Sequence, residues 1–440
     1  MRFHSLAMAA FILALPAARA QNLLTNGEQI YQALQKVGAV SRSRPGDLSN
    51  YSIAIIDNGF EGLARYGHVL GSNVKLVSGG ETPESQNSKH GFGMAQIMMV
   101  ASGAMQLPEN QRPEVLLLTA NGYTEFKKAV EFCIGKDPKR PRVDLILNSK
   151  NFYWGSDFQG GGFFNAVVAS ATAAGIVWVN AVGNTGDSVY FGTKIETLDR
   201  NVVKAPGPGN TILFESKFDD QDFDIVLSWN DFRDDSEYAT RKDLDFNLLR
   251  VDQKSKRMTI VPGGKGNRRQ IGRHLRKNES GVSGNAFEEV SLRLPERGLY
   301  AIRIYDRSGN FDERDQFQLR VATANPMALN MIHKNKVNEV TAPADRSDVI
   351  AVGSRDFISA VGRPGGINKP DVLIDLSERN FEFRYSDSFT TGLDTSSAAA
   401  LYAGIAIQLM ASDANFSSEK LLRFLHSNSG ARRPWRWPLN

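Results

Sequence analysis

The chain has 440 residues, of which 41% are apolar and 23% charged, and its formal net charge is +4. These proportions are ordinary for a globular protein, and the length favours one large domain together with a smaller one. A charge this small does not indicate a nucleic-acid partner, and no segment after the N-terminal one is apolar for long enough to cross a membrane. Cys133 is the single cysteine, which excludes a disulfide framework within the chain; we expect its side chain to serve packing.

Residues 1–20 have the pattern of a secretory signal peptide. The segment MRFHSLAMAAFILALPAARA has a basic start, a short apolar stretch and Ala-Arg-Ala before Gln21. We therefore predict cleavage after Ala20 and a secreted or periplasmic location. Loss of Arg2 and Arg19 lowers the formal charge from +4 to +2. We expect no nucleic-acid partner and no transmembrane segment.

Apolar runs alternate with helical patterns between residues 50 and 185. YSIAIID, EVLLLTA, VDLILNS and IVWVNAVGN read as strands, and AQIMMVASGAM, FKKAVEFCIG and FFNAVVASATAAG read as helices. This alternation predicts a parallel sheet with crossover helices. Functional groups of such sheets lie in the loops beyond the carboxyl ends of the strands. Asp57, Ser149 and Asn184 each follow a predicted strand in this way.

The pattern changes near residue 205, after the turn-rich sequence APGPGN. Short alternating segments such as FDIVLSWND, EEVSLRLP and GLYAIRIYD follow, separated by charged loops, and predict an antiparallel β-sandwich over residues 205–325. Strand patterns return at SDVIAVGS and KPDVLID, before TSSAAALYAGIAIQLMAS, predicted to be a buried helix, and SSEKLLRFLHSN, predicted to be a surface helix. We therefore predict that residues 21–204 and 326–440 form one domain, with the sandwich inserted between them.

Four side chains in these segments could carry chemistry, but each also has a structural interpretation. His90 lies where the glycine-rich sequence NSKHGFG leads into an apolar helix, a place where histidine usually packs or caps. Asp57 in DNG is a common turn residue. Ser396 and Ser397 precede an apolar helix, where hydroxyl groups usually accept hydrogen bonds from unpaired backbone N–H groups. Only the combination of these residues points to catalysis.

That combination resembles one family. SIAIIDNGF, HGFGMA, AVGNTG, KPDVLID and DTSSAAALYAG are similar, in order, to the aspartate, histidine, oxyanion-asparagine, pre-serine and serine motifs of subtilisin-like serine peptidases. The resemblance covers residues 50–204 and 326–425. It implies an α/β fold, a three-layer parallel sheet with helices on both faces, interrupted by the predicted β-sandwich. The sandwich itself resembles the jelly-roll domains of secreted bacterial peptidases.

The resemblance also implies a role for each matching residue. Ser396 aligns with the nucleophile and His90 with the general base, while Asp57 would orient the imidazole. The Asn184 side-chain amide and the Ser396 backbone N–H would bind the oxyanion. Ser149 and Gly183 match positions that pair with the extended substrate backbone. The implied protein is a secreted serine endopeptidase that acts on proteins or peptides and needs no cofactor for the chemistry.

Several residues depart from the family pattern. Asp394 stands in place of a glycine before the Thr-Ser pair, and Lys150 and Asn151 stand where a Leu-Gly pair commonly shapes the pocket. A carboxylate at position 394 would raise the pKa of His90 if it faced inward. These departures favour an alternative function, a catalytically silent relative that binds peptides or a cell-surface partner. The presence of all three catalytic side chains favours the enzyme.

Charged clusters in the predicted sandwich and near the C-terminus have both a structural and a ligand-binding interpretation. Six basic residues within KGNRRQIGRHLRKN fit either a solvated hairpin or contact with an anionic cell surface. RRPWRW near the C-terminus fits an interfacial segment or a strap packed across the α/β domain. Carboxylates in the first sandwich loops fit either solvated surface acids or structural calcium. These carboxylates are Asp219, Asp220, Asp222, Asp231, Asp234, Asp235, Asp243 and Asp245.

Overall fold

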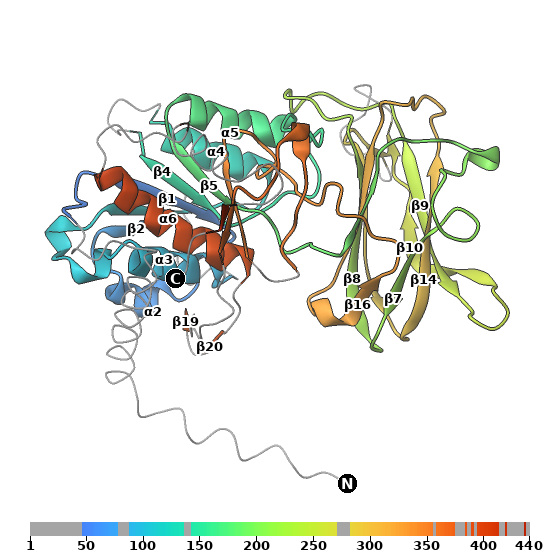
Figure 1. Cartoon of the computed structure of the whole chain (residues 1–440), viewed down its shortest axis with the longest axis horizontal. Helices are drawn as coiled ribbons and strands as arrows, with labels where there is room; N and C mark the ends of the chain where they lie inside the picture. Colours follow the sequence, from blue (N-terminus) through green and yellow to red (C-terminus); the bar gives the residue numbers. More distant parts are fainter. Residues whose placement is uncertain are drawn as a thin grey trace, which may run out of the picture.

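The protein consists of an α/β body and a body of antiparallel strands, which lie side by side along the long axis (Figure 1). Within the described residues, no helix combines the length and the apolar character needed to cross a membrane. The predicted signal peptide and nearly all of the predicted surface helix SSEKLLRFLHSN fall outside the described residues. The computed structural model describes residues 46–77, 88–135, 142–270, 282–354, 358–374, 383–384, 389–390, 394–412, 419 and 435–436.

A parallel sheet forms the centre of the α/β body. In the described part of the chain it has eight strands in the order β2-β3-β1-β4-β5-β17-β18-β21, and every neighbouring pair is parallel. This arrangement confirms the predicted α/β class. The strands are β1 (Ser52–Asp57), β2 (Val74–Leu76), β3 (Glu114–Thr119), β4 (Leu145–Asn148), β5 (Val177–Ala181), β17 (Ile350–Ser354), β18 (Val372–Ile374) and β21 (Trp435–Arg436).

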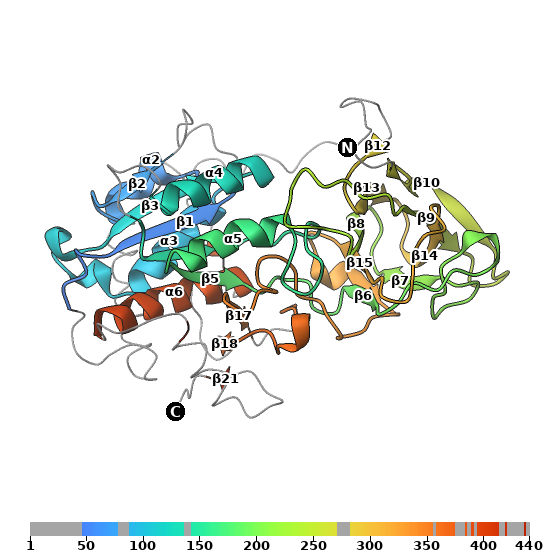
Figure 2. The same ribbon diagram turned by 90° about the horizontal axis from the view of Figure 1, so that it is seen from above.

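Helices cover both faces of the sheet, which gives three layers (Figure 2). Side chains alternate along β1, so Ile53 and Ile55 face α3 and α6, while Ala54 and Ile56 face α4 and α5. Burial of each large aliphatic side chain contributes about 1.5–3 kcal/mol. The helices are α2 (Leu63–Tyr66), α3 (His90–Ala101), α4 (Tyr123–Cys133), α5 (Phe163–Ala173) and α6 (Thr395–Ser412).

Helix α6 packs against the sheet and against α3, which explains why its sequence is apolar on all sides. Gly404 lies at the closest approach of the two helices. A Cβ added there would lie 2.6 Å from the Cβ of Ala101 and 2.6 Å from the carbonyl oxygen of Met98. Glycine is therefore needed for the two helices to pack at this distance.

The second body is a β-sandwich. One sheet has the order β10-β9-β14-β7-β16 and the other β13-β8-β15-β6, with antiparallel pairing throughout. Strands β6 and β16 lie outside residues 205–325, so the paired strands continue beyond the predicted insert on both sides. The strands are β6 (Val189–Gly192), β7 (Ile212–Ser216), β8 (Gln221–Trp229), β9 (Leu244–Val251), β10 (Met258–Gly266), β13 (Phe287–Leu294), β14 (Gly298–Asp306), β15 (Phe317–Ala322) and β16 (Leu329–Met331).

The core of the sandwich is continuous with the core on the α4 and α5 side of the α/β body. Trp154, which follows β4, stacks on Phe287 of β13 with ring centroids 4.5 Å apart and an interplanar angle of 9°. The guanidinium of Arg320, which is buried in β15, lies 4.1 Å from the ring centroid of Tyr153. The two bodies therefore share packed side chains and are not joined by a linker alone.

The carboxylates considered for calcium are spread over the sandwich, and several accept hydrogen bonds from the protein. Asp245 accepts from Arg307, and Asp219 accepts from the backbone N–H of Arg297. Among the described residues, no group of three or more His, Cys, Asp or Glu side chains is arranged to hold a metal ion. Calcium binding stays a prediction.

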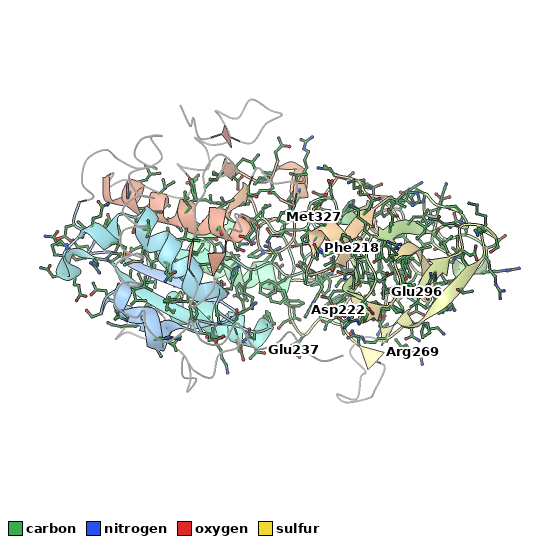
Figure 3. The ribbon with its side chains drawn as sticks, turned by 90° about the horizontal axis from the view of Figure 1, so that it is seen from below. Phe218, Asp222, Glu237, Arg269, Glu296 and Met327 are labelled. Carbon is green, nitrogen blue, oxygen red and sulfur yellow. The ribbon has the colours of Figure 1, made fainter. Side chains whose placement is uncertain are left out.

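The surface of the sandwich carries exposed apolar side chains at one edge. Phe218 and Met327 are 47% and 59% exposed, and the hydrogen bond from Lys217 N–H to the Ala328 carbonyl brings their segments together. Figure 3 shows both side chains on the same side of the sandwich.

The basic run considered for contact with an anionic surface lies partly in β10 and in β11 (Arg269–Gln270), and its remainder falls outside the described residues.

Candidate active site

Asp57 and His90 form a hydrogen-bonded pair at the carboxyl edge of the sheet. Asp57 is the last residue of β1 and is fully buried, while His90 is the first residue of α3. Nδ1 of His90 lies 2.9 Å from each carboxylate oxygen of Asp57. Oδ1 of Asp57 also accepts a hydrogen bond from the backbone N–H of Asn58 at 2.7 Å. The carboxylate is therefore fixed by backbone as well as by the imidazole.

A glycine after His90 allows this close approach. The backbone N–H of Gly91 donates to the Gly59 carbonyl at 3.0 Å, which ties the start of α3 to the loop after β1. A Cβ at Gly91 would lie 2.7 Å from the Cβ of Asp57 and 2.5 Å from the ring of Phe60. Any larger residue would push His90 away from Asp57.

The charges around His90 raise the pKa of its imidazole. Burial alone would lower the pKa, but the charge of Asp57 and its hydrogen bond to the ring outweigh burial. The charge of Asp394 raises the pKa further and that of Lys150 lowers it. The sequence-based expectation that an inward carboxylate at position 394 would raise the pKa of His90 is thus confirmed in direction. The imidazole remains 35% exposed, so solvent reaches it.

Ser396 lies in the first turn of α6 and is 5% exposed. Its Oγ donates to the backbone carbonyl of Ser149, which follows β4, at 3.3 Å. The neighbouring Ser397 uses its backbone N–H to donate to Oδ1 of Asp394 at 3.0 Å, a bond that caps the helix. Ser396 is therefore the serine whose hydroxyl meets the end of β4.

Asn184 is held at the N-terminus of α6. Its Oδ1 accepts from the backbone N–H of Thr395 at 3.1 Å and from the Thr395 hydroxyl at 2.7 Å. Its Nδ2 donates to Oδ2 of Asp394 at 2.9 Å. The amide proposed for an oxyanion is therefore already hydrogen-bonded to a carboxylate, a contact that the sequence analysis missed. The replacement of the family's glycine by Asp394 was the signal for it.

Asn151 connects the ends of β4 and β5. Its Nδ2 donates to the carbonyl of Ala181 at 3.0 Å, and it lies 3.4 Å from where a Cβ on Gly183 would stand. Gly183 has a φ of 106°, which favours glycine, and its carbonyl accepts from the N–H of Ala360. Asn151 thus lies beside the backbone of Gly183, one of the two predicted substrate-pairing residues, and follows the other, Ser149, by two positions.

Lys150 follows Ser149 after the end of β4, and its charge acts on His90. Its ammonium group donates to the carbonyl of Ala120, the residue after β3. Burial lowers the pKa of Lys150, although the charges of Asp57 and Glu125 act in the opposite direction. A cation at this position replaces the apolar wall expected from the family pattern.

The predicted site residues thus form two groups at one edge of the sheet. Asp57 and His90 are one group, and Ser396, Ser149 and Asn184 are the other. Asp394 connects the groups, because it binds Asn184 directly and acts on His90 through its charge. All the elements that carry these residues meet at the carboxyl ends of β1, β4 and β5.

The sheet order, the two helix layers and this edge together define a subtilisin-like fold with an additional β-sandwich. The CspB protease of Clostridium perfringens has a similar structure, with a TM-score of 0.54 and 14% identity over 92% of this chain and 94% of that chain. The psychrophilic subtilisin-like protease Apa1 from Antarctic Pseudoalteromonas sp. AS-11 is aligned over 92% of this chain and 91% of that chain, with 11% identity and a TM-score of 0.32. No family model and no curated protein matches the sequence.

Proposed function

We propose that the protein is a secreted serine endopeptidase in which Ser396, His90 and Asp57 hydrolyse peptide bonds. The observation that carries the proposal is the buried Asp57 carboxylate bonded to Nδ1 of His90, at the sheet edge where Ser396 begins a buried helix. A carboxylate on Nδ1 leaves Nε2 as the free acceptor of the neutral imidazole, which is the nitrogen that a general base needs.

In the proposed reaction, Ser396 Oγ attacks the substrate carbonyl while His90 Nε2 accepts the hydroxyl proton. The imidazolium then gives this proton to the leaving amine, which releases the first product and leaves an acyl group on Ser396. Water attacks the acyl group by the same proton path, which restores the hydroxyl and releases the acid. Asp57 stays ionised throughout and stabilises the imidazolium.

In the proposed reaction, substrate binding must first release the Ser396 hydroxyl from the Ser149 carbonyl. Ser396 Oγ now donates to the Ser149 carbonyl, so its proton is directed away from His90. An extended substrate that pairs with the strand end would offer a backbone N–H to the same carbonyl. The serine hydroxyl would then be displaced from the carbonyl, and the proposed reaction requires it to turn toward His90.

Oxyanion stabilisation is proposed for the Asn184 amide and the backbone N–H of Ser396. The first turn of a helix has N–H groups without intrahelical acceptors, and its positive potential favours an anion. The two hydrogen bonds from Thr395 to Oδ1 of Asn184 orient the amide toward the start of α6. Such preorganised donors typically contribute about 10²- to 10³-fold to turnover.

A serine-directed fluorophosphonate tests the proposal. The reagent should label the protein at Ser396, and Ser396→Ala should abolish labelling and casein cleavage. Ser397→Ala is the matched control, because it removes the adjacent hydroxyl and should retain both. Casein cleavage should also disappear in His90→Ala. Labelling that persists in Ser396→Ala would refute the assignment.

A second candidate function is peptide binding without catalysis. The observations that favour it are the engagement of the Asn184 amide by Asp394 and of Ser396 Oγ by Ser149. The two functions differ in one measurement. A silent relative would bind extended peptides without reacting with the fluorophosphonate, whereas the peptidase reacts.

A further inference from the structure

Asp394 accepts two hydrogen bonds, one to each carboxylate oxygen, and they serve different purposes. Its Oδ1 accepts from the backbone N–H of Ser397 at 3.0 Å and so caps α6. Its Oδ2 accepts from Nδ2 of Asn184 at 2.9 Å. Helix capping requires only the first bond, because serine or asparagine at this position could make it without a charge. The second bond is therefore an addition that a helix cap does not explain.

The amide of Asn184 cannot turn freely away from this carboxylate. Its Oδ1 holds two donors from Thr395, at 2.7 and 3.1 Å, and a rotation of the amide would break both bonds. Nδ2 therefore points at Asp394 as long as Thr395 keeps its place in the first turn of α6. The same fixed orientation would serve an oxyanion, because it presents N–H groups at the start of the helix.

The oxyanion of a tetrahedral intermediate would accept a hydrogen bond from Nδ2 of Asn184, as the Asp394 carboxylate does. Nδ2 has two N–H groups, and the carboxylate takes one of them. The other could still reach an oxyanion, but the negative charge of Asp394 lies next to that position and repels a second anion. The carboxylate thus resembles, in charge and in hydrogen-bond acceptance, the group that the amide would stabilise during catalysis.

We propose that Asp394 is a positioning residue that restrains the peptidase reaction by holding the Asn184 amide and by placing a negative charge beside the oxyanion position. This inference rests on the proposed function and deepens it. Turnover then requires Asp394 to move off Asn184, or proceeds with the oxyanion only partly stabilised. Asp394 acts through Asn184 and touches no reacting atom.

Asp394→Ser is the variant that separates the two bonds. A serine oxygen can still accept from the Ser397 N–H and cap the helix, but the shorter, neutral side chain does not reach Asn184. Asp394→Asn keeps the length and the cap but removes the charge, and it places an NH2 group opposite Nδ2 of Asn184, so the bond to Asn184 is lost as well. Asp47→Ser is the matched control, because Asp47 also accepts from a nearby backbone N–H, that of Ser49 at 2.8 Å, and is exposed.

The rate constant for fluorophosphonate labelling and kcat for a peptide substrate are the readouts. Asp394→Ser should raise both by about 10-fold, the low end for loss of a charged competitor, because Asn184 is exposed to solvent. Asp394→Asn, which also releases Asn184 from a carboxylate, should likewise raise both, and Asp47→Ser should leave both unchanged. A second signature is the acid limb of the pH–rate profile. The charged groups acting on His90 are Asp57, Lys150 and Asp394, and loss of Asp394 lowers the pKa of His90, so the limb moves to lower pH.

The outcomes distinguish this inference from the function on which it rests. If wild-type protein is labelled at Ser396 and folded Asp394→Ser and Asp394→Asn react no faster, the restraint is refuted and the peptidase stands. If neither the wild type nor the folded variants are labelled, the peptidase itself is refuted, and the restraint with it. Faster labelling of Asp394→Ser than of Asp47→Ser, together with the shifted acid limb, supports the inference.

Discussion

Asp57→Asn replaces one oxygen of the buried carboxylate by an NH2 group and leaves the side-chain volume nearly unchanged. In the wild type, Oδ1 accepts from the Asn58 N–H at 2.7 Å, and both oxygens lie 2.9 Å from Nδ1 of His90. If the amide oxygen of the substituted side chain keeps the bond from Asn58, its NH2 group faces Nδ1. The imidazole must then accept at Nδ1 and carry its proton on Nε2, where it cannot accept the serine proton.

The opposite orientation of the introduced amide is disfavoured by the backbone. It would place the NH2 group against the Asn58 N–H, and leaving this partly buried donor unpaired costs about 1–3 kcal/mol. The unproductive tautomer should therefore predominate by about 5- to 150-fold at 25 °C. The variant also lacks the negative charge that stabilises the imidazolium. Together these losses should lower kcat by about 10⁴-fold, the magnitude known for the same substitution in a Ser-His-Asp peptidase.

Two measurements check this prediction. Peptide hydrolysis gives kcat, and NMR titration of the histidine ring gives the pKa of His90, which should fall in Asp57→Asn because Asp57 raises it in the wild type. Asp144→Asn is the matched control, since Asp144 accepts from the Ser52 N–H at the opposite end of β1. A loss of kcat below about 10-fold, or an unchanged His90 pKa, would refute the roles assigned to Asp57 and His90.

Four further predictions concern stability and reactivity. Gly404→Ala should destabilise the protein by about 2–3 kcal/mol through overpacking of α6 on α3, measured by urea unfolding, whereas Gly46→Ala, with open space around it, should be neutral. Burial raises the pKa of Cys133 to about 12, so a thiol reagent should leave the folded protein unmodified and react only after unfolding. Burial also raises the pKa of Glu288 from 4.5 to about 7, so its contribution to stability is full below pH 4.5 and is lost by pH 7. Glu288→Gln should remove about 3 kcal/mol of that pH dependence, which thermal melts at pH 5 and 7.5 would detect. If the sandwich binds calcium, a chelator should lower the Tm; an unchanged Tm would refute the predicted calcium binding.

The parallel sheet was predictable because its signals are local. Continuous apolar runs such as that of β1, followed by a polar residue, identify buried strands and the edge where functional groups gather. Asp57, Ser149 and Asn184 were placed at that edge for this reason. The five motifs, in their order along the chain, then indicated a subtilisin-like fold, because such an order rarely arises by chance.

Other features depend on partners far away in sequence, which local sequence patterns do not identify. Strand β21 has only two residues, and it joins the sheet through pairing with Val372 and Leu373 of β18. The short β6 and β16 extend the sandwich in the same way. The bond between Asn184 and Asp394 spans 210 positions and depends on the orientation of two side chains. Periodicity and propensity carry no information about such contacts.

The aromatic stack between the two bodies has a mechanical consequence for the strand ends at the candidate site. Asn151, which bridges the strand ends, precedes Trp154 by three residues, and Trp154 is stacked on Phe287 of the sandwich. So short a stretch of backbone has little slack. A tilt of the sandwich relative to the α/β body would therefore displace the backbone beside Ser149, whose carbonyl accepts from Ser396 Oγ.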